Sequence, residues 1–356
     1  MEISARSIWE RAAGVASLVA TPLVPSHYVE LIDPLRTTHV RHARVEAVRD
    51  ETPDARTLTL RPGTGWRPHR AGQFVKVGVE VDGRILGRTY SITSAPERAD
   101  GRITITVKAL VNGRASVALA RHSRPGDYLT IGLPQGDFTL PEGPPPARVL
   151  FVTGGSGITP VMSMLRSLAA RGAMPDVVHV HYVKTPPDLI FGYELARLAS
   201  AGQGYRLTVV TTRKGGSRFD RATLDAIAPD WRSRETWACG PEPLLDAVAE
   251  HVPSAHVERF RAKLGPAPHG AAGGRVRFGR SKKELDASGA TSLLEAAERA
   301  GVFAPHGCRM GICHSCDATL LGGCVRDLRN GRTIDEPGAS FQPCVCAAAG
   351  DVEIDL

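Results

Sequence analysis

The chain reads Pro-His-Gly-Cys-Arg-Met-Gly-Ile-Cys-His-Ser-Cys from Pro305 to Cys316, which places three cysteines on one short loop. A further cysteine, Cys344, follows after an interval of 27 residues. The spacing C-x4-C-x2-C with a distant fourth cysteine is that of a plant-type [2Fe–2S] cluster. We therefore predict that Cys308, Cys313, Cys316 and Cys344 bind two irons and two sulfides.

Other readings of these cysteines remain open. A C-x2-C pair with nearby histidines could hold structural zinc, although a zinc ribbon does not need the extra cysteine four positions earlier. Disulfides are less favoured, because no signal peptide is visible and closely spaced cysteines of a cytosolic protein more often bind metal. Cys324 and Cys346 compete with Cys344 for the fourth ligand position, and the interval favours Cys344.

The 356 residues are enough for two or three domains with separate cores. The formal charge is +7, but residues 275–356 hold 10 Lys and Arg against 11 Asp and Glu, so the excess lies in the earlier part. Bound phosphates would suit that excess. No basic run interleaved with aromatic residues occurs, which argues against a nucleic-acid partner.

Residues 1–38 are interpreted as an N-terminal extension. Its apolar stretch from Ile3 to Leu23 is interrupted by Arg6, Glu10 and Arg11, so it is neither a spanning helix nor a secretory signal. We expect a surface helix that packs on the body, with docking to a membrane or a partner as the alternative. The expected location is the cytoplasm, with peripheral association at the inner face of the membrane left open.

Residues 39–141 show short β-rich runs separated by Gly and Pro, which is typical of a small antiparallel barrel. The expected strands are 42–48, 56–60, 73–81, 89–93, 103–110 and 128–133, with one helical segment at 116–122.

Two motifs in this barrel suit a flavin. Arg88-Thr89-Tyr90-Ser91 offers a cation for phosphate, a ring for stacking and a hydroxyl for a polar ring edge. Downstream, a helix start can present free N–H groups to a diphosphate. Its residues are Gly113, Arg114, Ala115 and Ser116, with Lys108 on the strand before them. Each motif alone could be an ordinary strand or a simple helix cap.

These two motifs, followed by Pro134-Gln-Gly-Asp-Phe138, resemble the ferredoxin–NADP reductase superfamily. The resemblance implies FAD as the flavin. FMN is the alternative, because relatives with a C-terminal ferredoxin domain use FMN with the same first motif.

A Pro-rich connection at 141–146 separates the barrel from residues 147–261, where strands and helices alternate as in an open parallel sheet. The run Thr153-Gly-Gly-Ser-Gly-Ile-Thr-Pro160 lets the backbone approach a diphosphate, with Thr159 as a possible helix cap. The resemblance makes it the NAD(P) diphosphate loop and assigns contacts to Gly154, Gly155, Ser156, Gly157 and Thr159.

Two strand ends of this domain complete the predicted nucleotide site. Arg213 and Arg218 follow a strand where the superfamily contacts the adenine ribose, and cations there favour NADPH over NADH. Cys239, Gly240 and Pro241 resemble the superfamily's C-G-P motif beside the nicotinamide. Cys239 is then a positioning contact, because hydride passes directly between cofactors. Ser91, Cys239 and Glu258 are the expected residues at the reacting rings.

A Gly- and Pro-rich linker at 262–273 precedes residues 274–356, which read as an α+β module of the β-grasp ferredoxin type. Expected elements are strands 276–278 and 283–286, a helix at 292–300, and closing strands at 317–321 and 351–354. The predicted fold is therefore multidomain: an antiparallel β-barrel, an α/β parallel sheet and a ferredoxin domain. Electrons are expected to pass from NADPH to FAD to the cluster and then to an external acceptor.

The whole chain, including residues 25–34 and 325–331, resembles actinobacterial reductases that are paired with membrane acyl-CoA desaturases. This resemblance implies a membrane di-iron desaturase or hydroxylase as acceptor, and hence a place in lipid metabolism. Cytochrome P450s and Rieske oxygenases are alternative acceptors. A flavin- and cluster-containing redox sensor without turnover, or a zinc-stabilised structural protein, are the alternatives from other classes.

Overall fold

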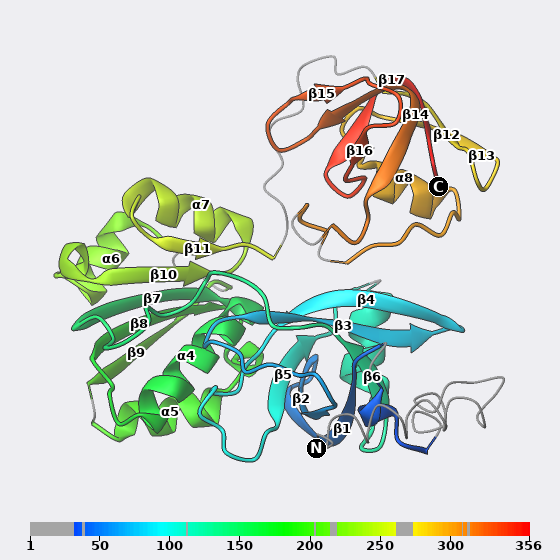
Figure 1. The fold of residues 1–356 in the computed structure, drawn as a ribbon. Helices are drawn as coiled ribbons and strands as arrows, with labels where there is room; N and C mark the ends of the chain where they lie inside the picture. The colour runs from blue at the N-terminus through cyan, green and yellow to red at the C-terminus, as the bar shows by residue number, and fades with distance from the viewer. Residues whose placement is uncertain are drawn as a thin grey trace, which may run out of the picture.

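The computed structural model describes residues 32–37, 40–111, 113–202, 204–213, 219–260, 273–307, 309–311 and 314–356. They form three domains in chain order, an antiparallel barrel, a parallel α/β sheet and a mixed sheet with one helix (Figure 1). The predicted fold class is confirmed. The predictions for residues 1–31, for Arg218, for the linker at 262–272 and for Cys308 and Cys313 lie outside the described residues.

The barrel is closed by antiparallel pairing in the order β4-β3-β6-β1-β2-β5. An isolated bridge between Ile92 and Ile105 joins its two outer strands. Alternate residues of the strands fill the interior, as in Val75, Val77 and Val79, and this alternation is why the segments form half-buried strands. The strands are β1 (His42–Thr52), β2 (Ala55–Pro62), β3 (Phe74–Val81), β4 (Arg84–Ser91), β5 (Ile103–Lys108) and β6 (Tyr128–Ile131).

Strand β4 begins five residues earlier than the sequence suggested. Asp82 and Gly83 both have positive φ, 51° and 70°, and form a two-residue hairpin turn that pairs Val81 with Arg84. An Asp-Gly pair is the expected sequence of such a turn. The strand therefore runs unbroken through Gly87 to Ser91.

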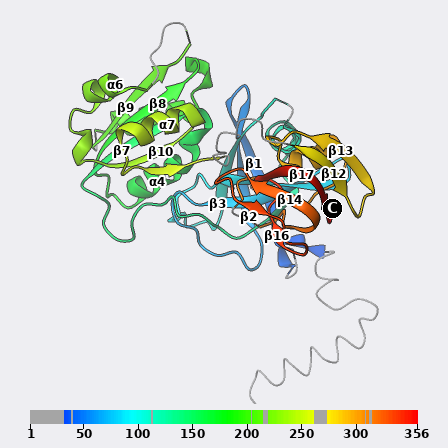
Figure 2. The ribbon, with the colours of Figure 1, turned by 90° about the horizontal axis from the view of Figure 1, so that it is seen from above.

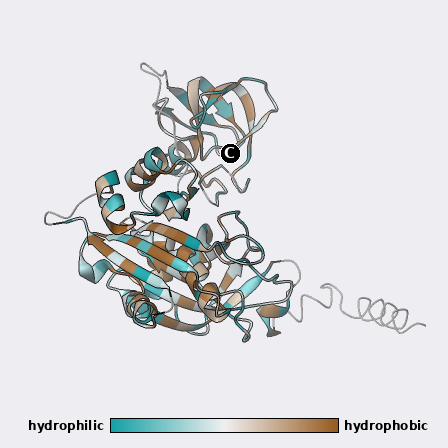
Figure 3. Cartoon of the chain, turned by 90° about the vertical axis from the view of Figure 1, so that its left-hand side faces the viewer, coloured by the Kyte–Doolittle hydropathy of each residue, from teal (hydrophilic) through white to brown (hydrophobic). Residues whose placement is uncertain are grey.

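The second domain is a five-stranded parallel sheet in the order β11-β10-β7-β8-β9. Strand β7 is buried from Val149 to Gly154, which explains its continuous apolar sequence. Helices α4 and α5 cover one face and α6 and α7 the other, and Figure 3 shows hydrophobic residues along the strands between them. The elements are β7 (Arg148–Gly154), α4 (Ile158–Ala170), β8 (Asp176–Val183), α5 (Gly192–Ser200), β9 (Tyr205–Thr211), α6 (Arg221–Ile227), β10 (Glu235–Cys239), α7 (Glu242–His251) and β11 (His256–Glu258).

The strand order reverses between β7 and β10, because the chain proceeds from β7 to β8 and β9 and then returns to the other side of β7. In open α/β sheets, ligands bind at the carboxyl ends of the strands at this reversal. The ends of β7 and β10 carry Gly154 and Cys239, so the fold brings the two predicted nucleotide motifs together.

The third domain places its first and last strands side by side, with β12 parallel to β17. Helix α8 packs on this sheet through Leu293, Leu294, Ala296 and Ala297. The elements are β12 (Gly274–Phe278), β13 (Lys283–Ala287), α8 (Leu293–Arg299), β14 (Ala318–Asp327), β15 (Thr333–Ile334), β16 (Ser340–Phe341) and β17 (Cys346–Ile354).

Two strands of this domain are longer than expected. Strand β14 continues past Leu321 to Asp327, because register shifts around Gly322 and Gly323 absorb the glycine pair that reads as a turn. Strand β17 begins at Cys346, five residues early, because pairing with β14 overrides the low strand preference of its alanines.

The third domain stands over the barrel on the side of β3 and β4, as both Figure 1 and Figure 2 show. In the part of the chain that the structure describes, no helix combines the length and the apolar character needed to span a bilayer.

Candidate functional site

The first predicted motif lies at the end of β4. Arg88, Thr89 and Tyr90 are half-buried and Ser91 is buried. The Arg88 guanidinium donates a hydrogen bond to the Gly87 carbonyl at 2.8 Å. Burial raises the pKa of Tyr90 to about 12, so its hydroxyl stays neutral. Burial, and then the nearby Arg309, lower the pKa of Arg88. A phosphate ligand would stabilise the charged form of Arg88 and so offset the cost of burying it.

The Ser91 hydroxyl is buried and has no hydrogen-bond partner among the described residues. A buried polar atom without a partner costs about 1–3 kcal/mol, so native proteins rarely leave one unsatisfied. Its position at the end of the Arg88–Ser91 motif therefore fits a polar group of a bound cofactor.

The second flavin motif starts a helix that packs near β4 and β5. Ser116 Oγ accepts a hydrogen bond from Leu110 N at 3.1 Å and donates one to the Gly113 carbonyl at 3.0 Å. A Cβ on Gly113 would lie 2.3 Å from Ser116 Oγ, so a larger residue there would displace the Ser116 hydroxyl from these bonds. The helix runs through α3 (Arg114–Val117) and continues as a wider turn at Ala118–His122. Its first-turn N–H groups, including that of Ala115, are the usual diphosphate donors.

Two predicted cations near this turn have protein partners. The Arg114 guanidinium is exposed and pairs with Asp82 at 2.5 Å. Lys108 Nζ lies 3.1 Å from Asp54 and 3.9 Å from Asp188, a residue of the second domain. Lys108 thus stands at the junction of two domains.

The nucleotide loop packs directly on the end of β10. A Cβ on Gly157 would lie 2.1 Å from the Cys239 carbonyl oxygen, and one on Gly154 would lie 2.8 Å from the Pro241 ring. Gly240 is equally close, with its Cβ position 3.0 Å from Gly154 N. These glycines therefore allow two loops to meet where a nucleotide would bind.

The start of α4 differs from the expected cap. The helix begins at Ile158 after Gly157, and no side chain caps it. The Thr159 hydroxyl instead donates to the Ser156 carbonyl at 2.9 Å, and Pro160 is the third helical residue. Gly155 has φ +53°, so the loop turns sharply just before the helix.

Cys239 and Glu258 are paired neighbours at the ends of β10 and β11. The thiol is 3.8 Å from Glu258 Oε2. Burial, followed by the Glu258 charge, raises the pKa of Cys239 well above its usual value. Burial also raises the pKa of Glu258 to about 8. Both groups are therefore neutral near pH 7, which suits positioning contacts and argues against a thiolate nucleophile.

A buried polar network beside this pair was missed from the sequence. Thr153 Oγ1 contacts His179 Nε2 at 2.7 Å and His181 Nδ1 at 2.6 Å, and His179 Nδ1 contacts the Tyr205 hydroxyl at 2.8 Å. His181 Nε2 is buried without a partner among the described residues. The alternation His-Val-His within an apolar strand was the available signal.

Arg213 lies just after β9 and is exposed, two residues beyond the strand end at Thr211. Its exposed side chain could reach an additional phosphate on a nucleotide bound at the ends of the strands.

Two of the four predicted cluster ligands are described. Cys316 and Cys344 are both buried, with their sulfur atoms 3.3 Å apart, and neither forms a disulfide. Two thiols this close fit ligands of one metal centre. Cys346 is buried in β17, and the Cys324 thiol points to the Val325 carbonyl at 3.8 Å. This geometry favours Cys344 over both as the fourth ligand. Within the described ranges no group of three His, Cys, Asp or Glu could hold a metal, and Cys308 and Cys313 fall outside those ranges.

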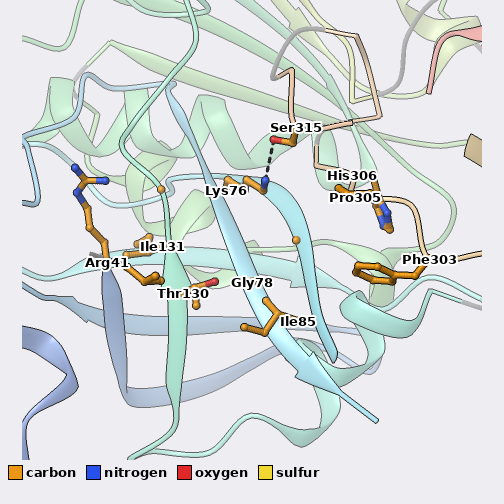
Figure 4. Close-up of a pocket in the computed structure, with 13 residues that line it drawn as sticks. Arg41, Lys76, Gly78, Ile85, Thr130, Ile131, Phe303, Pro305, His306 and Ser315 are labelled. Atoms are coloured by element: carbon orange, nitrogen blue, oxygen red, sulfur yellow. Dashed lines mark hydrogen bonds between the residues drawn. The ribbon is translucent and has the colours of Figure 1, made fainter. Parts of the chain in front are cut away.

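His306 and Ser315, on either side of the cysteine motif, face β3 and β4 across a crevice of about 400 Å³ (Figure 4). Lys76 of β3 donates a hydrogen bond to Ser315 Oγ at 2.8 Å. The His306 carbonyl oxygen lies 3.5 Å from the place of a Cβ on Gly87. Gly87 directly precedes Arg88, so the predicted flavin site and cluster loop are neighbours in space.

Three family descriptions match consecutive parts of the chain. They are an oxidoreductase FAD-binding domain at residues 44–140, an oxidoreductase NAD-binding domain at 151–250, and a 2Fe-2S iron-sulfur cluster binding domain at 277–349.

Known proteins resemble the chain over nearly its full length. An NADPH oxidoreductase of Mycobacterium tuberculosis is 45% identical over 358 residues, which cover 98% of this chain and 93% of that protein. The glycine betaine monooxygenase reductase subunit of Pseudomonas aeruginosa is 32% identical, covering 80% and 87%. The solved structure of phthalate dioxygenase reductase, a modular structure for electron transfer from pyridine nucleotides to [2Fe–2S], has a TM-score of 0.62 at 25% identity, covering 88% and 97%.

Proposed function

Because this chain belongs to the ferredoxin–NADP reductase-type oxidoreductases with a C-terminal [2Fe–2S] domain, we propose that it carries electrons from NADPH to a separate oxygenase. It is an NAD(P)H oxidoreductase with FAD-binding, NAD(P)-binding and [2Fe–2S] domains. When bound, FAD accepts a hydride and releases single electrons, which a [2Fe–2S] cluster relays one at a time.

The residues of the barrel would hold and orient the flavin. Arg88 offers charge to its phosphates and Tyr90 a face for its ring. The Ser91 hydroxyl, which has no partner among the described residues, offers a hydrogen bond to its polar edge. The backbone N–H groups at Gly113–Ser116 would bind the diphosphate.

The second domain would bind NADPH at the strand reversal. The loop Gly154–Thr159 offers backbone N–H groups to the diphosphate, and Arg213 and Arg218 offer charge to the additional phosphate. Cys239, Gly240, Pro241 and Glu258 would border the nicotinamide and exclude water there. The relative named NADPH oxidoreductase supports NADPH over NADH.

The single observation that carries the proposal is the close approach of residues beside the cysteine motif to β3 and β4, through the Lys76–Ser315 hydrogen bond and the His306 carbonyl near Gly87. Electron transfer needs short separations, and this packing supports the order flavin before cluster. Cys308, Cys313, Cys316 and Cys344 would be the cluster ligands.

The test compares two electron acceptors in the purified, reconstituted protein. In Cys313→Ser we expect NADPH-dependent reduction of cytochrome c to be lost while ferricyanide reduction by the flavin survives. Cys324→Ser, which removes a thiol that is not a proposed ligand, should keep both activities. If Cys313→Ser retains both rates unchanged, the proposed electron order is wrong.

For the acceptor we propose a membrane di-iron desaturase or hydroxylase, which is supported by the likeness of the whole chain to desaturase reductases. A Rieske-type oxygenase or a cytochrome P450 is the second candidate, because one relative is named as the reductase subunit of a glycine betaine monooxygenase. Reconstitution with one oxygenase of each class, scored by product per NADPH consumed, decides between them. In a redox sensor, NADPH would bleach the flavin and cluster absorbance, but none of these mixtures would form product.

A further inference from the structure

The hairpin that follows β14 touches the cysteine loop through one arginine. Arg329 Nη1 donates a hydrogen bond to the Gly311 carbonyl at 3.0 Å, in the middle of the loop between Cys308 and Cys313. Gly311 has φ +70°, and a Cβ there would lie 2.5 Å from Arg329 Nη1 and 2.8 Å from Val345 Cγ2. Only glycine therefore allows this close approach.

A carboxylate fixes the arginine in place. Asp327 accepts hydrogen bonds from Arg329 Nε at 3.0 Å and from Arg329 Nη2 at 2.6 Å, a bidentate arrangement. The Asp327 side chain is only 10% exposed, whereas that of Arg329 is 35% exposed. Loss of either partner would leave the other charge unbalanced in a partly buried place.

The same hairpin is also tied to the segment that contains Cys344. Asp327 pairs with Cys346 in the β14–β17 ladder, and Leu328 N donates to the Val345 carbonyl at 2.8 Å. One charge pair therefore connects the loop of three cysteines with the segment of the fourth.

We propose that Arg329 and Asp327 form a positioning pair for the [2Fe–2S] cluster, an inference that rests on the proposed ligand set. Arg329 holds the cysteine loop closed through Gly311. The balance of the two charges sets the reduction potential of the cluster, because one-electron reduction adds a negative charge beside them. Net charge and hydrogen bonding around the sulfurs are known determinants of such potentials.

A charge cycle in the full-length, cluster-loaded protein tests the electrostatic part. Arg329→Gln leaves the carboxylate alone and should lower the cluster midpoint in a spectroelectrochemical titration. Asp327→Asn leaves the cation alone and should raise the midpoint. The double variant should return close to the wild-type value. Two single variants that shift in the same direction, or not at all, would overturn the proposal.

The matched control is Arg326→Gln, which removes the same charge from the neighbouring strand position. Its guanidinium donates to the Gly289 carbonyl at 2.6 Å instead of to the cysteine loop. We expect its midpoint to stay nearer to the wild type than that of Arg329→Gln. An equal shift in both variants would mean that the general charge of the domain, and not this pair, sets the potential.

The loop-holding part is tested by the rate at which iron is lost to a chelator. Arg329→Gln and Gly311→Ala should both lose iron several-fold faster than the wild type, whereas Gly311→Ala, with both charges kept, should shift the midpoint less. Arg329→Lys keeps the positive charge, so its midpoint should stay nearer to the wild-type value. It replaces Arg329→Gln in this comparison if the glutamine variant fails to fold. Wild-type rates of iron loss in both loop variants would refute this part. A wild-type protein that takes up no cluster would instead refute the proposed function itself.

Discussion

Arg213 is the described residue that we expect to discriminate NADPH from NADH. It follows β9 and its side chain is exposed to solvent. We predict that Arg213→Glu lowers kcat/KM for NADPH about ten- to a hundredfold, because a hydrogen bond between charged groups contributes about 1.5–3 kcal/mol. The value for NADH should change little. Steady-state kinetics with both nucleotides measure the effect.

Arg206→Glu is the control, since Arg206 lies at the opposite end of the same strand and pairs with Asp176 at 2.9 Å. Equal losses for NADPH and NADH in Arg213→Glu would contradict a role in phosphate recognition.

Glu258 gives a pH-dependent prediction for stability. Burial raises its folded-state pKa from 4.5 to about 8, so the unfolded state loses its proton first as the pH rises. The contribution of Glu258 to the free energy of unfolding should therefore fall between pH 4.5 and about 8, by at most about 1.4 kcal/mol per pH unit. Glu258→Gln lacks the titration. Thermal unfolding measured across this pH window should show the stability of the variant rising relative to that of the wild type as the pH increases. If stability depends on pH in the same way in both proteins, Glu258 is not held protonated.

At single positions, the sequence was informative where the residue type itself carries chemistry. Arg88–Ser91 and the cysteine spacing could be read directly, and Ser91 does present a buried hydroxyl without a described partner. His179 and His181 were missed, because a histidine inside an apolar strand has the same pattern as any buried residue. Only the neighbouring strands reveal that Thr153 and Tyr205 contact His179, and that Thr153 contacts His181 Nδ1.

Strands β7, β8 and β9 share this polar network, and it makes the parallel sheet sensitive to acid. Burial lowers the pKa of His181 to about 3 and that of His179 well below 6.5. Below pH 6.5 these two histidines bind protons in the unfolded state but stay neutral in the folded state. Their contribution to stability therefore falls as the pH falls toward 3. Each histidine contributes a slope of up to about 1.4 kcal/mol per pH unit.

His181→Asn should remove one of these slopes, because an amide can still contact Thr153 but does not titrate. Urea unfolding followed at several pH values between about 4 and 7 measures the difference from the wild type. Identical pH dependence in the two proteins would mean that His181 becomes protonated within the fold.

The positions of the elements followed from periodicity, while several of their ends did not. The early start of β4 was signalled by Asp82-Gly83, a turn pair that can be recognised without a structure. For β14 the local sequence was misleading, because the pair Gly322 and Gly323 predicts the end of a strand. Only the register shifts against β17 accommodate these glycines within it. Strand ends are set by the partner strand, which the local sequence does not contain.

The placement of the third domain over β3 and β4 could not be predicted, because the contacts that the described residues make there come from residues without a motif. Lys76 and Ser315 are 239 positions apart, and Arg84 lies over the Phe303 ring at 5.6 Å. Interfaces between domains of one chain often resemble transient protein–protein interfaces, in which a single contact can decide how often the domains meet. The linkage of the flavin and cluster sites is thus a property of the whole molecule.

Replacement of Lys76 should weaken the contact between the barrel and the third domain without changing the flavin site or the cluster ligands. We predict that Lys76→Glu leaves hydride transfer from NADPH unchanged but slows electron transfer from the flavin to the cluster several-fold, because the bond to Ser315 is lost. Stopped-flow spectroscopy resolves flavin bleaching from cluster bleaching in one experiment. Arg124→Glu makes the same charge change at an exposed site elsewhere on the barrel and should leave both phases intact. If the cluster phase of Lys76→Glu keeps its wild-type rate, the docked arrangement is not the one through which electrons pass.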